Sequence, residues 1–284
     1  MGARRMDSVV IARWLPRVLA VVFATLAIPA IAADTAPPPI RQFDIPTIEK
    51  LGREMYEQDQ EAWKATDILR AKHSDDELKA GKLHGWIVDS FPDHDVVRFV
   101  HDGAGGPEAY YDVTFPRVGG EPVLSMPASP VLSADELAQY SARTLALANV
   151  ERPCSQKYNT IALNDPERDE WLVWALASTT EPGVIVYGGH YRFTMSRDGK
   201  TVVERDALSR ACMNVPPPDP SKGQVAFNVF VQLVSDIPVE TAVWLNLQHK
   251  VPMMLITMDR KEWTIVDGHI TQTGELPAQG QSAK

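Results

Sequence analysis

The order of two apolar periodicities constrains the fold of this chain more than any other feature. A segment at helical spacing, from about Thr47 to Ala71, precedes a run of strand-like segments, and a second helix beginning at Ser133 precedes another. Strands that follow one another without an intervening helix pair mostly antiparallel. The sequence therefore predicts an α+β fold with two amphipathic helices packed on a mostly antiparallel β-sheet. The repeated order suggests a degenerate helix-plus-strands duplication. The predicted strands are Gly85–Asp89, Val96–His101, Ala109–Phe115, Asn159–Leu163, Glu170–Ser178, Val184–Tyr187, His190–Ser196, Thr201–Arg205, Ala226–Ser235, Val239–Gln248, Met253–Met258 and Glu262–Asp267.

Both predicted helices carry recognisable local signals. Pro46 stands in the first turn of the first helix, where its missing N–H costs nothing. In the second helix, Ser133 and Glu136 have the spacing of a capping box. Each helix has one apolar stripe, formed by Ile48, Leu51, Met55, Ala62 and Leu69 in the first and by Leu137, Tyr140, Thr144 and Ala148 in the second.

The N-terminus has the three parts of a secretory signal peptide. Arginines are followed by the uncharged apolar run Val18–Ile28 and then by Ala30-Ile31-Ala32, which has small side chains at a cleavage site. A membrane-spanning helix needs roughly 20 apolar residues, so an uncleaved anchor is the weaker alternative. We expect residues 1–32 to be a cleaved signal peptide and the mature protein to be periplasmic or secreted. Residues 33–40 then form a Pro-rich linker.

The chain contains two cysteines, Cys154 and Cys212. In an oxidising compartment an even pair is typical of a disulfide. A redox-active pair is the alternative, but it would usually occur as Cys-x-x-Cys, which is absent from the sequence. The sequence therefore predicts a structural disulfide between these two residues.

The charge balance argues against two kinds of partner. The formal net charge is −9, and removing residues 1–32, with four arginines and one aspartate, makes it −12. An acidic surface repels nucleic acid and anionic lipid. We therefore expect neither nucleic acid nor membrane to be a partner after signal cleavage.

Proline-rich breaks divide the mature chain. The sequence predicts an N-terminal helix-plus-strands unit at 41–130 and a second such unit, carrying the disulfide, at 131–214. Beyond the break at Val215–Gly223, we expect C-terminal strands at 222–270 that complete the sheet, and a flexible tail at 271–284.

The hairpin around Asp198-Gly199 gives the most detailed local prediction. A three-residue loop with Gly199 left-handed sets Phe193 opposite Val203, Arg192 opposite Glu204 and His190 opposite Asp206. A two-residue loop would pair Phe193 with Glu204 and Arg192 with Arg205, which is worse on both faces. By element order, the stretch Ser133 to Leu208 resembles small exported α+β modules such as PepSY or cystatin-like units, and this resemblance implies no activity.

Three residues are candidates for catalysis if the protein is an enzyme. Asp59 falls on the apolar stripe of the first helix, where a carboxylate must be hydrogen-bonded or have a raised pKa. We expect it to be buried and tied to a backbone amide or to a neighbour such as Tyr56. His190 follows two glycines and is predicted to pair with Asp206 on a solvated sheet face, which favours a structural contact over a catalytic dyad.

Other motifs give weaker signals. Asp93-His94-Asp95 and His101-Asp102 contain metal-ligating side chains, but acidic turns before strands commonly cap the backbone. The sequence lacks Gly-x-Ser-x-Gly and His-Glu-x-x-His. We therefore expect no cofactor and no metal.

The function expected from these features is a non-catalytic one. We predict an exported binding, inhibitory or accessory protein that contacts a protein or peptide partner in the cell envelope through a sheet face. The alternatives are an exported hydrolase with an Asp/His site and a purely structural role in the envelope. An enzyme should show a pocket where titratable groups converge, and a binding module should show an exposed apolar patch.

Overall fold

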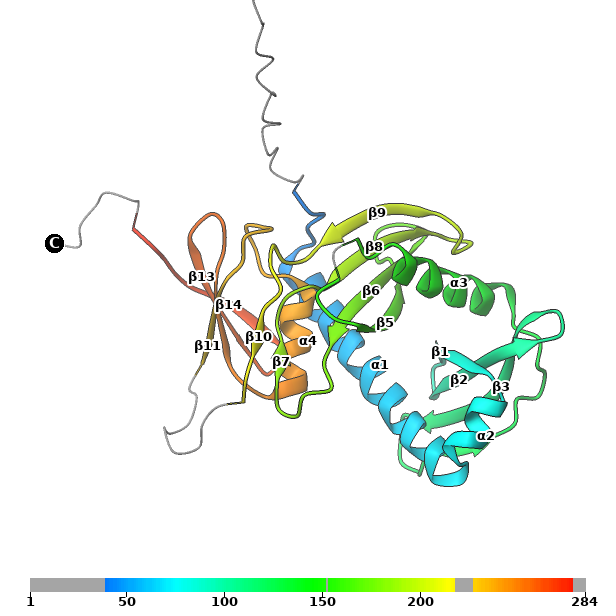
Figure 1. The fold of residues 1–284 in the computed structure, drawn as a ribbon. Coiled ribbons are helices and arrows are strands. Elements are labelled where there is room, and N and C mark those ends of the chain that lie inside the picture. Colours follow the sequence, from blue (N-terminus) through cyan, green and yellow to red (C-terminus); the bar gives the residue numbers. More distant parts are fainter. Residues whose placement is uncertain (1–38, 152, 218–226, 278–284) are drawn as a thin grey trace, which may run out of the picture. The chain divides into compact units, whose positions relative to one another are not determined.

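The computed structural model describes residues 39–151, 153–217 and 227–277 (Figure 1). The predicted signal peptide and residues 33–38 of the predicted linker lie outside this part. Ile40, the last residue of that linker, is buried in the main hydrophobic cluster, so it belongs to the folded core. Within the described ranges, no helix is long and apolar enough to cross a membrane.

Two of the four helices in this part of the chain lie where the sequence predicts helices. Asp44 caps the first helix by accepting a hydrogen bond from the Thr47 amide, and the predicted stripe from Ile48 to Leu69 is buried. Ser133 and Glu136 form the predicted capping box. The helices are α1 (Ile45–Lys72), α2 (Asp75–Ala80), α3 (Ala134–Ala148) and α4 (Glu240–His249).

Helix α3 buries a different face from the predicted one. Leu137 is 40% exposed, whereas Ala138 is buried and Ala142 and Ala146 pack against the second sheet. This face is buried because the polar residues beside the alanines have buried partners on both sheets: Gln139 bonds Val88 of the first sheet, and Arg143 bonds Thr160 of the second.

Two antiparallel meanders each follow a helix. The first sheet has the order β1-β2-β3-β4 and the second the order β5-β6-β8-β9, and a short ribbon pairs β7 with β10. The single sheet of the prediction is therefore replaced by separate sheets. Their strands are β1 (Leu83–Ser90), β2 (His94–Gly103), β3 (Gly106–Pro116), β4 (Val123–Ser125), β5 (Lys157–Asn164), β6 (Glu170–Ser178), β7 (Ile185–Val186), β8 (Tyr191–Ser196), β9 (Val202–Ala207) and β10 (Asn214–Val215).

The C-terminal region forms a third sheet of its own, with the order β11-β12-β13-β14. β11 and β12 pair in parallel, and the other neighbours are antiparallel. The parallel pair is possible because α4 provides the crossover between its strands. These strands are β11 (Asn228–Val231), β12 (Met253–Ile256), β13 (Lys261–Val266) and β14 (His269–Glu275).

Two sequence predictions in this region are wrong. Val239–Gln248, predicted as a strand, is mostly α4, because a segment that is buried on nearly all sides has no helical stripe to reveal it. The predicted flexible tail begins too early, since Thr271 to Glu275 belongs to β14. The third sheet packs its inner face against α4 and α1, which lie side by side (Figure 1).

The register predicted for the β8–β9 hairpin is also wrong. Arg192 lies opposite Asp206 and Phe193 opposite Arg205, so β9 is shifted by two residues from the prediction. One residue of the shift comes from the turn, because the Ser196 amide donates to the Thr201 carbonyl and leaves a four-residue loop. The other comes from a bulge at Val203. Gly199 is left-handed as predicted, with φ of 70°.

Two glutamines connect the helices to the edges of the meanders. Gln139 of α3 bonds both backbone groups of Val88 on β1, with both distances 3.0 Å. Gln58 of α1 bonds both backbone groups of Ala162 on β5, with both distances 3.3 Å. Each helix therefore covers an edge strand of the meander that follows the other helix.

Candidate functional site

A groove lies between β11, α4 and the segment 208–213, and we call it the β11 groove. It holds a cavity of about 170 Å³. No carboxylate stands among the described residues that line the groove, and Arg210 is the one charged residue among them. Its apolar lining includes Tyr187, Leu208, Met213, Phe230, Leu245 and Leu255.

The disulfide fixes the wall of the groove formed by residues 208–213. Cys154 and Cys212 are bonded as predicted, with their Cα atoms 5.3 Å apart. The Tyr187 amide donates to the Met213 carbonyl at 2.7 Å, and the Gly189 amide donates to the Ser209 hydroxyl at 2.7 Å. This wall is therefore held at both of its ends.

Gly188 and Gly189 are needed for this wall. A Cβ atom on Gly188 would collide with the Ala211 carbonyl oxygen. Gly189 is left-handed, with φ of 89°, and a Cβ atom there would collide with Cys154. The glycines thus allow the wall and the disulfide to lie close to the backbone.

The opposite wall is an unpaired strand edge. The Asn228 amide donates to the carbonyl of Pro252, just before β12, at 2.9 Å, and the Gln232 amide donates to Ile256 of β12 at 2.8 Å. In a parallel ladder, alternate residues bond to the same neighbour, so the N–H and C=O groups of Val229 and Val231 face the outer edge. Within the described part of the chain, no strand pairs with that edge.

The outward face of this strand is apolar, whereas its inward face carries Asn228 as well as Phe230. Phe230 faces inward and lines the cavity. The outward-facing side chains of Phe227, Val229, Val231 and Leu233 are 43–59% exposed. Four exposed apolar side chains in alternation form a continuous patch beside the groove, a feature typical of interaction sites.

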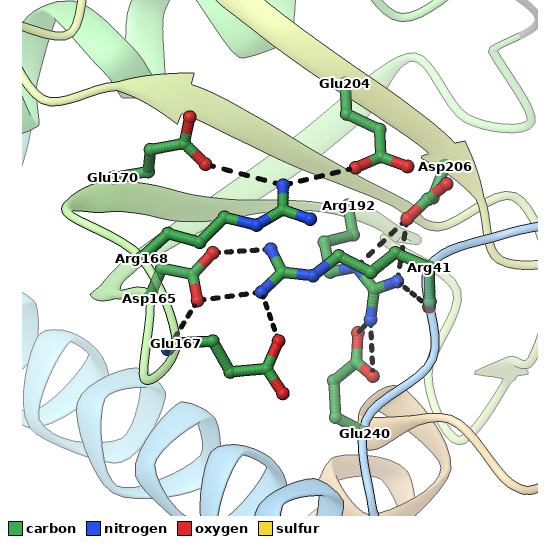
Figure 2. Close-up of polar contacts among 9 residues, drawn as sticks. All are labelled: Arg41, Asp165, Glu167, Arg168, Glu170, Arg192, Glu204, Asp206 and Glu240. Atoms are coloured by element: carbon green, nitrogen blue, oxygen red, sulfur yellow. Dashed lines mark hydrogen bonds and ion pairs between the residues drawn. The ribbon is translucent and has the colours of Figure 1, made fainter.

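A buried ionic cluster holds the start of α4 (Figure 2). Helix α4 also lines the groove. Arg192 is 1% exposed and bonds Asp206 at 2.7 Å and both Glu240 oxygens at 3.0 Å. Trp174 donates a further hydrogen bond to Glu240 at 2.7 Å. Burial alone would lower the pKa of Arg192, but the two carboxylates raise it above its usual value.

The N-terminal segment joins the same cluster (Figure 2). The Arg41 carbonyl accepts a hydrogen bond from Arg192, and the Arg41 guanidinium forms a bidentate salt bridge with Asp165. Burial works against the charge of Asp165, yet Arg41 lowers the pKa of this carboxyl below its usual value. The cluster offers no space for a water-sized molecule around Arg41 and Arg192, so we assign it a structural role.

The predicted pairing of His190 with Asp206 is wrong. His190 is 2% exposed, and its carbonyl accepts a hydrogen bond from the Leu208 amide, whereas Asp206 pairs with Arg192. Its Nδ1 accepts from the Ala177 amide at 3.1 Å, and its Nε2 donates to the Val186 carbonyl at 3.0 Å. Burial lowers the pKa of His190 to about 4, so the neutral ring is a structural part of the sheet.

Asp59 is buried as predicted, but the expected tie is missing. It is 2% exposed, and the described residues provide neither a backbone amide nor the Tyr56 hydroxyl as a donor. The Trp244 indole nitrogen faces it closely enough to lower its pKa slightly, yet not in good hydrogen-bond geometry. Burial dominates and raises the pKa of Asp59 to about 6.

The histidines considered as metal ligands have other partners. His94 pairs with Asp93 at 2.8 Å, and Asp95 pairs with Arg117 at 2.6 Å. His101 lies 3.9 Å from Glu108. Among the described residues, no group of three or more His, Cys, Asp or Glu side chains is placed to hold a metal ion.

The structure therefore does not bring Asp59, His190 and Asp206 together at a cavity, and none of them lines the β11 groove. The groove itself was not identified from sequence, although the alternation from Phe227 to Leu233 is visible there. Comparisons with protein-family models, with curated proteins and with solved structures found no match.

Proposed function

We propose that this is an exported, non-catalytic binding protein that holds an apolar protein or peptide segment in the β11 groove. The observation that carries this proposal is the apolar cavity beside an unpaired, apolar strand edge. Concave, mostly apolar sites with a few polar groups are typical of ligand binding. Export is part of the proposal, and the disulfide supports it because disulfides persist in oxidising compartments.

The rival hydrolase has less support. An active site needs titratable groups that converge on a space open to substrate. His190 and Asp206 are engaged in separate contacts, and Asp59 lies at the packed contact of α1 with α4. No observation favours a hydrolase at these residues.

Selection of phage-displayed peptides on the mature protein tests the proposal. We expect the enriched peptides to contain alternating apolar residues and to bind at the groove. Val231→Asp should then weaken binding about tenfold or more, because it places a charge in a desolvated contact.

Val203→Asp is the matched control, since Val203 on β9 is 51% exposed and Val231 is 59% exposed. It should leave binding unchanged. If no peptide is enriched, or if both variants lose binding equally, the groove is not the binding site.

A further inference from the structure

We propose that the β11 groove recognises the carboxyl-terminal end of an extended polypeptide, which adds to β11 as a parallel strand with its terminal carboxylate at Arg210. This inference rests on the proposed function and specifies its ligand.

The unpaired backbone of β11 favours a strand as the ligand. Val229 and Val231 present two N–H and two C=O groups to the outer edge of β11, as the ladder to β12 requires, and Val231 lines the groove. An extended peptide pairs such groups by adding a strand to the sheet. A globular surface without a strand would leave them unpaired, which costs free energy at a desolvated contact.

Arg210 marks where this ladder ends. Its Nε donates to the Leu233 carbonyl at 2.7 Å, so the last outward carbonyl of the strand is already occupied. A ligand strand loses its pairing partner at this point. If it runs parallel to β11, its C-terminus lies there, beside the terminal nitrogens of the guanidinium. An antiparallel strand would instead bring an ammonium group to the guanidinium, and like charges repel.

The charges of the groove complement a carboxylate. The whole chain has a net charge of −9, yet the described lining contains no acidic residue and contains Arg210. A planar guanidinium suits bidentate binding of a carboxylate. The groove is thus a place on an acidic protein where an anion is favoured.

The cavity beneath β11 accounts for one side chain of the ligand. Side chains of a β-strand alternate between faces, so an added strand directs every second one toward α4. A volume of about 170 Å³ matches one large apolar side chain, since an apolar cavity of about 150 Å³ holds benzene. The groove is lined by β11 and by the segment 208–213, so an added strand would lie between them.

The experiment measures fluorescence anisotropy of the mature protein with one labelled probe peptide, Thr-Val-Thr-Val-Thr-Leu, as the free acid and as the C-terminal amide. We expect the amide to bind about tenfold more weakly, because it lacks the charge-assisted hydrogen bonds to Arg210. In Arg210→Gln, the acid and the amide should bind equally. In Arg70→Gln, an exposed control on α1, the ratio should be unchanged.

A third probe is N-methylated at the valine in its fourth position. It should bind at least about tenfold more weakly, because the methylated amide cannot donate a hydrogen bond to the edge of β11. Equal affinities of acid and amide for the unmodified protein would overturn the carboxylate inference and leave the proposed function standing. If neither the probes nor the phage-selected peptides bind, the proposed function fails as well.

Two further outcomes would assign the groove to other occupants and overturn the proposal. The first is a dimer, seen by light scattering, that Val231→Asp dissociates. The second is probe binding that occurs only after residues 218–226 are replaced by a Gly-Ser linker of equal length.

Discussion

The edge of the third sheet differs from the inner edges of the two meanders. β1 and β5 are each covered by a helix whose glutamine bonds both backbone groups of one residue. The outer edge of β11 has no such cover among the described residues. An uncovered apolar edge is a liability that proteins usually suppress. Its retention here, beside a cavity, is consistent with a site kept for a partner.

The two covered edges also resemble each other in detail. β1 and β5 both have eight residues, and in each the glutamine meets the sixth, Val88 or Ala162. The helix before each meander covers the other meander. This reciprocal arrangement separates the two meanders from the third sheet.

The largest loss of folding free energy is expected at the ionic cluster of Arg192, which holds α4 against the second sheet. Arg192→Met leaves Asp206 and Glu240 buried without their cation, which should lower the free energy of unfolding by about 3–5 kcal/mol. Arg168→Met is the control, because its contacts to Glu170 and Glu204 are 3.6 and 3.9 Å and partly exposed. It should cost less than about 1 kcal/mol in the same urea titration. Equal losses would show that the cluster does not anchor α4.

The next largest losses of folding free energy are expected at the covered edges of β1 and β5. Gln139→Met keeps the shape of the side chain but leaves the Val88 N–H and C=O unpaired and buried, so we expect a loss of about 2–4 kcal/mol. Gln58→Met should cost less, because its hydrogen bonds are longer. Gln60→Met is the control, since Gln60 bonds the side chain of Gln248 and no strand. A loss for Gln60 as large as that for Gln139 would break the comparison.

Local signals in the sequence were sufficient for part of this fold. The stripe of α1, the capping box of α3 and most strands depend on neighbouring residues, and the disulfide follows from an even cysteine count in a chain predicted to be exported. The register of β9 was missed because neither the four-residue loop nor the bulge at Val203 leaves a signal in the pairing of side chains. The fold class was thus predictable, whereas the alignment of its strands was not.

The site depended on contacts that no local pattern encodes. Arg192 and Glu240 are 48 residues apart, and the groove brings β11 against the segment 208–213 through α4 and the disulfide. Helix α4 itself was hidden because residues Glu240 to Asn246 are all buried, so neither helical nor strand periodicity stands out. Alternation in β11 indicated a strand, but only the sheet order shows that its edge is unpaired.

Gln58 and Asp59, neighbours on α1, differ in the same way as the covered and uncovered edges, because only one of them has its hydrogen-bond partners. Gln58 has its partners, whereas Asp59 is buried without a good donor and has a pKa raised to about 6. A raised carboxyl pKa means that the folded state disfavours the charge, so this penalty is absent below about pH 4 and complete above about pH 6. Asp59→Asn should therefore raise the free energy of unfolding by about 1–3 kcal/mol at pH 8 and change it little at pH 4. A less stable variant at pH 8 would show that the ionised carboxylate is structural.

The smallest effect on stability is expected at the uncovered edge itself. Val231 is 59% exposed and its outward backbone groups have no strand partner, so the folded monomer gains little from its apolar side chain. Val231→Thr keeps the β-branched shape and should change the free energy of unfolding by less than about 0.5 kcal/mol. Binding of the probe peptide should nevertheless weaken severalfold, because the hydroxyl adds a desolvation cost at the contact. Val203→Thr, at an exposed bulge on β9, should change neither quantity. A loss of stability at Val231 comparable to that at Gln139 would mean that this edge is part of the core, and its apolar side chains would then need no partner to explain them.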